Sequence, residues 1–165
     1  MQDNPAEAEK SRDRLAAITL DPKSLGRTLA NVEHEREVAI FDILDGNSFA
    51  LDGLDAGPYK LHLSVLDDRL QLAVADDGDK AIAAHQVPLT PLKRIMKDYF
   101  LVCESYYDAV RSAPPARIQA IDVSRRALHG EGSLVLTEKL SGKITMDTDT
   151  ARRLFTLVCA LHWKG

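Results

Sequence analysis

The spacing of apolar residues changes at Thr90, and this change restricts the fold more than any other feature of the chain. Between residues 59 and 76, apolar and polar residues alternate, which is the period of a half-buried strand. From Thr90 onward, apolar residues recur with the spacing of amphipathic helices. The sequence therefore predicts an α+β fold, in which an antiparallel β-meander of about three to five strands precedes helices concentrated in the C-terminal half.

Capping residues and glycines divide the helical half into separate elements. Thr90 is the expected N-cap of a helix that begins with Pro91, because proline is favoured in the first helical turn. Gly130 and Gly132 predict an interruption after His129, because glycine weakens a helix interior. The segment that follows fits either a helix or a short strand. The predicted helices cover residues 32–45, 91–113, 116–129 and 148–163, and the first predicted strand covers residues 15–20.

The helix expected over residues 91–112 has a broad apolar face, so we predict that it is the most buried helix. The side chains expected in the core are Tyr99, Phe100, Val102, Cys103 and Tyr106 of this helix, with Phe155, Leu157 and Leu161 of the last helix. Cys103 and Cys159 lie in apolar runs without a CxxC or CxxH pattern, so we predict neither a disulfide nor a metal site. We also predict no cofactor, because phosphate-loop, dinucleotide-binding and nucleophile-elbow motifs are absent from the sequence.

Length and composition limit the remaining classes. A chain of 165 residues can bury a core of its own, and its polar start predicts a flexible tail over residues 1–12 before a single globular domain over 13–165. The sequence has no apolar run typical of a signal peptide or membrane span, so we expect a cytoplasmic protein with no membrane partner. The net charge of −4 argues against nucleic acid as a partner.

The charges are unevenly distributed along the chain. Residues 1–90 carry 9 basic and 17 acidic side chains, whereas residues 91–165 carry 12 and 8. Two interpretations stay open. The basic half presents a face to an anionic partner, or it meets the acidic half within the same domain.

A charged cluster on the helix expected over residues 116–129 is the strongest candidate site. The predicted binding residues are Arg125, Arg126, His129 and Glu131. With Asp122, the first three have the spacing i, i+3, i+4, i+7, which places them on one arc of the helix. Two arginines and a histidine can hold a phosphate or a carboxylate. The alternative is a structural stripe of ion pairs.

Charge balance in this cluster predicts a dependence on pH. Asp122 and Glu131 balance the two arginines while His129 is neutral, so protonation at or below about pH 6.5 makes the cluster positive. We therefore expect the partner, an unidentified protein or a small anionic ligand, to bind more tightly at mildly acidic pH. Arg152 and Arg153 are further candidates, because cations near the start of a helix need a compensating anion. This anion is either a bound ligand or the neighbouring Asp147 and Asp149.

The sequence leaves open whether the protein is an enzyme. The first hypothesis is a binding or regulatory module that recognises an anion or a partner. The alternative is a small enzyme in which His129 or His34 acts as general base and the arginines hold an anionic substrate. In that case Glu131 or Glu33 would orient the base.

Several runs of the chain together carry a family resemblance. The runs are VEHEREVAIFDIL (32–44), GPYKLHLSV (57–65), KDYFLVCESYYDAV (97–110), IDVSRRALHGEGS (121–133) and DTARRLFTLVCALHWKG at the C-terminus. They resemble the uncharacterised protein family numbered 0262, a family of short bacterial proteins. The resemblance covers nearly everything after residue 15. It implies a single cytoplasmic domain of bacterial origin, and it transfers no activity, cofactor or functional residue.

Overall fold

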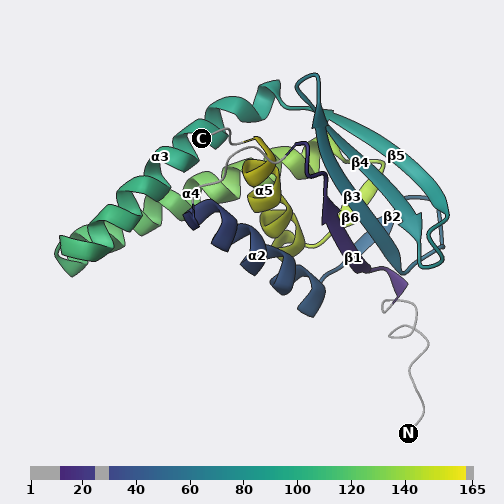
Figure 1. Cartoon of the computed structure of the whole chain (residues 1–165), viewed down its shortest axis with the longest axis horizontal. Helices are drawn as coiled ribbons and strands as arrows, with labels where there is room; N and C mark the ends of the chain where they lie inside the picture. The colour runs from purple at the N-terminus through teal and green to yellow at the C-terminus, as the bar shows by residue number, and fades with distance from the viewer. Residues whose placement is uncertain (1–11, 25–29, 163–165) are drawn as a thin grey trace, which may run out of the picture.

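The α+β fold predicted from the sequence is confirmed in the computed structural model (Figure 1). The structure describes residues 12–24 and 30–162, without the side chains of residues 30–32. The predicted flexible tail, apart from Arg12, lies outside the described residues. In chain order the elements are β1 (Leu15–Leu20), α2 (Ala30–Asp45), β2 (Phe49–Leu51), β3 (Tyr59–Leu66), β4 (Arg69–Asp76), β5 (Ala81–Pro88), α3 (Thr90–Ser112), α4 (Pro115–Lys139), β6 (Ile144–Met146) and α5 (Thr148–His162).

The main sheet has four strands in the order β1–β3–β4–β5. β3, β4 and β5 form the expected antiparallel meander. β1 instead runs parallel to β3, so the sheet is mixed rather than wholly antiparallel. Parallel neighbours need a crossover connection, and α2 and β2 lie in the chain between these two strands. β2 pairs with β6 in a separate two-stranded sheet.

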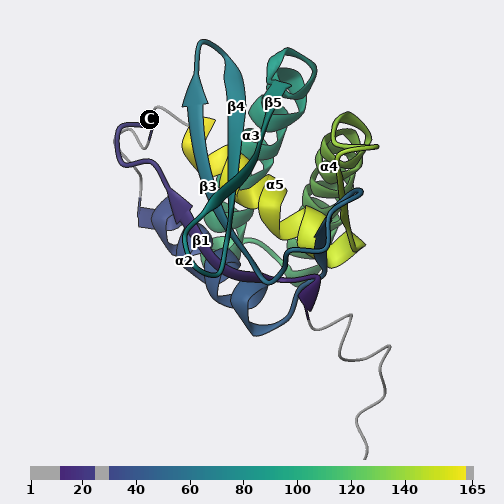
Figure 2. The ribbon, with the colours of Figure 1, turned by 90° about the vertical axis from the view of Figure 1, so that its right-hand side faces the viewer.

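Alternation along the strands gives the sheet one buried face. Leu61 pairs with Val74 and Leu63 pairs with Leu72 across β3 and β4, and all four side chains are buried. His62, which lies between the two leucines of β3, is exposed on the opposite face. The helices cover the leucine face, as a half-buried antiparallel pair requires (Figure 2).

Among the described helices, α5 is the most buried, and the prediction that α3 is the most buried is wrong. α5 contacts α2, α4 and β3, so it is surrounded on several sides (Figure 2). The distal part of α3 instead extends with α4 away from the sheet (Figure 1). Tyr99, Phe100 and Cys103 of α3 are nevertheless buried as predicted, and so are Phe155, Leu157 and Leu161 of α5. Val102 and Tyr106 are only half-buried, so the prediction is wrong for these two residues.

The predicted interruption at Gly130 and Gly132 is also wrong, because α4 continues through both glycines to Lys139. A Cβ atom on Gly132 would lie 2.8 Å from Cδ2 of Phe155, and closer still to Cε2 and Cζ. Gly132 therefore marks a close contact between α4 and α5 rather than a helix end.

The helix starts agree with the prediction in part. α5 begins at Thr148 as predicted, and Asp147 is its N-cap, because the Asp147 side chain accepts a hydrogen bond from the Thr150 amide at 2.8 Å. Thr90 is not a cap. It is the first residue of α3, which has Leu89 at the N-cap position and no side-chain capping bond.

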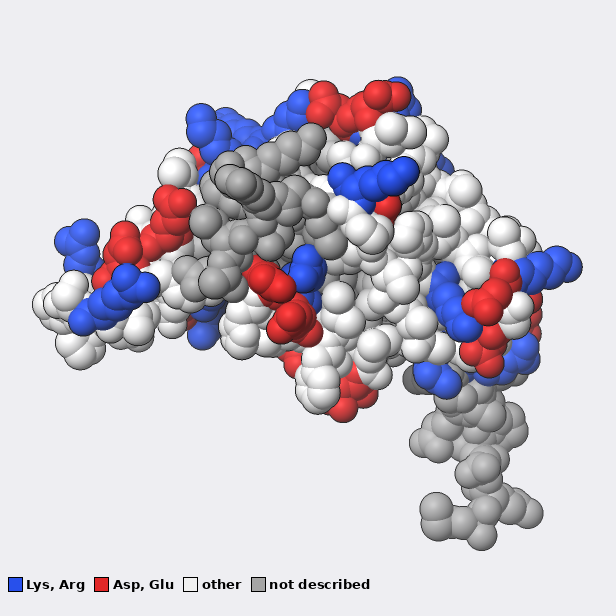
Figure 3. Space-filling view, in the orientation of Figure 1, with Lys and Arg blue, Asp and Glu red and all other residues white. Residues whose placement is uncertain are grey.

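Charges are mixed on the surface that faces the viewer in Figure 3. Acidic and basic side chains are interspersed there, and they do not form one continuous basic face. On this side, the acidic and basic halves of the chain therefore share one surface. No helix in the described part of the chain has the length and apolar character needed to span a membrane.

Candidate functional site

A pocket of about 340 Å³ opens between α2, α4 and α5, with one side chain from α3. Its lining residues are His34, Glu35, Val38, Ala39, Asp42, Tyr99, Arg125, Arg126, His129, Arg152, Arg153 and Thr156. We call it the arginine pocket. It brings three of the four predicted binding residues together with Arg152 and Arg153. The fourth, Glu131, is exposed and does not line the pocket.

Close packing of α4 on α5 assembles the basic part of this pocket. Gly132 on α4 contacts Phe155 on α5, so the residues just before each of them come close together. Arg152 Nη2 lies 3.5 Å from the position that a Cβ atom on Gly130 would occupy. The helical period places Arg126 and His129 on the same side of α4. Cations from two different helices therefore converge on one pocket.

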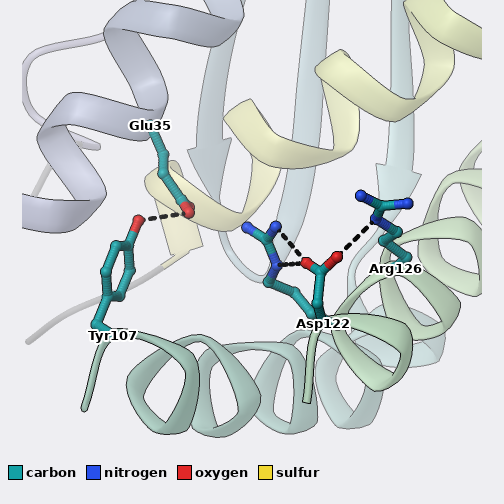
Figure 4. A network of polar contacts seen from close by, with 5 residues as sticks. Glu35, Tyr107, Asp122 and Arg126 are labelled. Carbon is teal, nitrogen blue, oxygen red and sulfur yellow. Dashed lines mark hydrogen bonds and ion pairs between the residues drawn. The ribbon is translucent and has the colours of Figure 1, made fainter. Parts of the chain in front are cut away.

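Asp122 holds the two arginines of α4 at once (Figure 4). Its Oδ1 accepts hydrogen bonds from Nε and Nη2 of Arg125 at 3.1 and 2.7 Å. Its Oδ2 lies 3.0 Å from Nε of Arg126. The hydrogen bond from Arg125 lowers the pKa of Asp122, so this carboxylate stays ionised.

Glu131, the second acid expected to balance the arginines, does not pair with them. Glu131 makes no ion pair with any residue that the structure describes. One carboxylate therefore serves two arginines, and the balance of two acids against two arginines inferred from the sequence is wrong.

The four arginines of the pocket differ in the contacts that they make with other parts of the fold. Arg125 stacks on the Tyr106 ring at 4.3 Å from its centroid. Arg153 donates hydrogen bonds of 3.5 and 3.2 Å to the backbone carbonyls of Asp42 and Gly46, at the end of α2. These two arginines therefore connect elements of the fold.

The other two arginines are freer to meet a ligand. The side chain of Arg126 is 75% exposed, and its only ion pair with a residue that the structure describes is with Asp122. Arg152 has no carboxylate within ion-pair distance among the described residues. Both residues line the pocket.

His129 is neutral at physiological pH. Its ring centroid lies 5.4 Å from that of Tyr99 and 5.5 Å from that of Phe155. Burial lowers the pKa of His129 to about 4, and the nearby charges of Arg152 and Arg125 add to this effect. His129 therefore does not protonate near pH 6.5, which removes the reason for expecting tighter anion binding at mildly acidic pH.

The opposite wall of the pocket is acidic, which the sequence analysis missed. Glu35 and Asp42 on α2 both line the pocket and are half-buried. The Tyr107 hydroxyl donates a hydrogen bond to Oε1 of Glu35 at 2.9 Å (Figure 4). Burial raises the pKa of Tyr107 and the Glu35 carboxylate raises it further, so the phenol keeps its proton. Within the described chain, the Asp42 carboxylate has neither a hydrogen bond nor an ion pair.

A signal for this acidic wall is present in the sequence. Glu35, Val38, Ala39 and Asp42 have the spacing i, i+3, i+4, i+7, the same spacing that identified the cluster on α4. Two of these four residues are apolar, so the arc resembles a packing face rather than a charged cluster.

The base–orienter pairs of the enzyme hypothesis do not form in this structure. His129 Nε2 lies 2.7 Å from the Thr156 hydroxyl, and no carboxylate of the described chain is bonded to its ring. His34 lines the pocket, but Glu33 lies 3.6 Å from Arg36 instead. The described residues also include no group of three or more His, Cys, Asp or Glu side chains arranged to hold a metal ion.

Comparison with known sequences identifies the family. Residues 12–164 match the family described as "Uncharacterised protein family (UPF0262)". The chain belongs to this family. The resemblance inferred from the sequence is thereby confirmed.

Bacterial UPF0262 proteins match nearly the whole chain. One from Mesorhizobium japonicum is 55% identical over 159 residues, which is 96% of this chain and 98% of that protein. One from Agrobacterium fabrum is 54% identical over 92% of this chain and 96% of its own length. One from Nitrobacter winogradskyi is 46% identical over 99% and 98%. No solved structure matches the chain.

Proposed function

We propose that this UPF0262 protein is a binding module whose arginine pocket holds a small anionic ligand, carrying a phosphate or a carboxylate. One observation carries the proposal. Four arginines from α4 and α5 converge on one concave pocket, whereas two carboxylates line it among the residues that the structure describes. Guanidinium groups bind phosphate and carboxylate oxygens through paired hydrogen bonds, so such a pocket is suited to an anion.

The shape of the site favours a small ligand over a protein partner. A flat basic stripe would suit a protein surface, whereas this site is a pocket of about 340 Å³, at the lower end of the size of small-molecule sites. Asp122 also holds Arg125 and Arg126 in place before any ligand arrives, which reduces the entropy lost on binding.

We place this function in the cytoplasm. Cys103 and Cys159 are both free and buried, which suits a reducing compartment. The net charge of −4 continues to argue against nucleic acid as the ligand.

Isothermal titration calorimetry with inorganic phosphate at low ionic strength tests the proposal. The wild type is expected to bind phosphate, and added salt should weaken the binding. The double variant Arg126→Ala with Arg152→Ala should lose about 100-fold in affinity, since each removes a charge-assisted contact worth at least about tenfold. Its melting temperature should hardly change, because Arg126 is exposed and Arg152 lies near the unfavourable end of α5 for a cation.

A matched double variant controls for net charge. Arg94 and Arg117 lie on α3 and α4 away from the pocket, and the Arg94 side chain is 93% exposed. Replacing both by alanine should leave phosphate affinity within about twofold of the wild type. The proposal is wrong if the wild type does not bind phosphate, or if the two double variants bind it equally well.

A further inference from the structure

Opposite charges face the arginine pocket from two walls without pairing across it. α2 contributes Glu35 and Asp42, whereas α4 and α5 contribute the arginines. No ion pair joins these acids to these arginines among the described residues. Groups of opposite charge that line one pocket and stay apart leave space for a ligand that carries both charges.

Two neighbouring tyrosines of α3 help to keep the walls apart. The Tyr107 hydroxyl binds Glu35, while the ring of Tyr106 supports the guanidinium of Arg125. The two rings contact each other edge to face, with centroids 6.0 Å apart. Arg125 is also bonded through two nitrogens to Asp122. Glu35 and Arg125 are therefore each held by a partner of their own, so the pocket keeps two separated charges in fixed positions.

Part of the pocket lining is apolar. Val38 and Ala39 line the pocket on α2, and Tyr99 lines it from α3. Burial raises the pKa of Tyr99, so its phenol is neutral and adds no charge. A ligand that fits this arrangement has a short apolar spacer between its two charged groups.

We infer that the ligand of the arginine pocket is a small zwitterion, with a phosphate or carboxylate bound by Arg126 and Arg152 and an ammonium group bound by Glu35 and Asp42. This inference rests on the proposed function, because it uses the same pocket. Asp42 is the stronger candidate for the ammonium contact, because its half-buried carboxylate has no other partner in the described chain. Glu35 keeps accepting capacity beyond its bond to Tyr107.

Matched ligands test the inference by calorimetry. Phosphoethanolamine and ethyl phosphate have a similar phosphate group and spacer, and only the first carries an ammonium group. β-Alanine and propionate form the corresponding carboxylate pair, so the two pairs show which anionic group the arginines prefer. In the preferred pair, the wild type should bind the zwitterion at least about tenfold more tightly, the worth of one charge-assisted hydrogen bond.

Removing the acidic wall should weaken the binding of the zwitterion but not that of the simple anion. In the double variant Glu35→Gln with Asp42→Asn, the zwitterion should lose its advantage, so that the affinity ratio falls to about one. The simple anion should bind as well as before or more tightly, because two repelling charges are gone. Gln at position 35 can still accept the Tyr107 hydrogen bond, which preserves the wall. Asp45→Asn, at the exposed end of the same helix, is the control and should leave both affinities unchanged.

The outcomes distinguish this inference from the proposed function. Equal binding of zwitterion and simple anion by the wild type overturns the inference and leaves the anion site standing. A preference for the zwitterion that survives in the double variant also overturns it. Binding of none of the four ligands, and no binding of phosphate, overturns both.

Discussion

Replacing Gly132 by alanine isolates the packing between α4 and α5. The added methyl group would lie 2.8 Å from Cδ2 of Phe155, and nearer to two other ring carbons. Phe155 is fully buried, so its ring cannot move into solvent. The helices must separate or the ring must leave its preferred rotamer, and overpacking of this kind costs roughly 1–3 kcal/mol.

Gly130 is a matched control on the same helix. A Cβ atom there would lie 3.5 Å from Arg152 Nη2, which is an ordinary contact. Alanine at either position gains about 1 kcal/mol from helix propensity, so this gain cancels when the two variants are compared. Gly130→Ala should therefore be more stable than the wild type by up to about 1 kcal/mol. The free energy of unfolding of Gly130→Ala should exceed that of Gly132→Ala by the overpacking cost alone, which is roughly 1–3 kcal/mol.

Urea denaturation followed by circular dichroism measures this difference as a change in the free energy of unfolding. In a second background, Phe155→Leu removes the ring that meets the new methyl group. Gly132→Ala should then cost much less, and a double-mutant cycle gives the coupling between the two positions. The reasoning is refuted if Gly132→Ala is as stable as Gly130→Ala, or if the cycle shows no coupling.

Two further predictions concern His129 and the start of α5. The pKa of His129 is about 4 in the folded protein and about 6.5 in the unfolded chain, so the unfolded chain binds more protons as the pH falls. The free energy of unfolding of the wild type should therefore fall by about 2 kcal/mol between pH 8 and pH 5 because of this group. In urea denaturation at a series of pH values, His129→Gln should not show this fall. Parallel pH profiles for the two proteins would contradict the assignment of the fall to His129. Asp147→Ala should lower the stability of the protein by about 1 kcal/mol, because it removes the N-cap of α5. Asp147→Asn should keep most of this stability in thermal denaturation, because asparagine can still accept the capping hydrogen bond. Equal losses for the two substitutions would show that the charge rather than the capping bond is responsible.

Local periodicity predicts which residues share a face, and this accounts for the correct part of the site. Arg125, Arg126 and His129 lie on one arc of α4 for reasons internal to that helix. The partner of that arc depends on contacts between helices, which periodicity does not contain. Glu35 and Asp42 likewise share one face of α2, but only the packed structure shows that this face lines the same pocket.

The strand pairing has the same limit. The alternation in β3 and β4 predicts a meander because a short turn joins them, and such turns favour antiparallel neighbours. The parallel pairing of β1 with β3 involves strands that α2 and β2 separate in the chain. A strand of six residues shows no pattern in its own sequence that selects its neighbour.

Gly132 is the residue at which the prediction of a helix end is wrong, and its lack of a side chain also helps to form the pocket. As an isolated signal, a glycine in a helix costs about 1 kcal/mol relative to alanine, which favours a break. Its missing side chain admits the ring of Phe155, a residue on another helix, and the buried contact outweighs that local cost. The same close approach brings Arg152 beside Gly130 and hence beside His129. A residue that sequence reasoning assigns to the end of a helix therefore allows the two helices to meet closely enough for their cations to line one pocket.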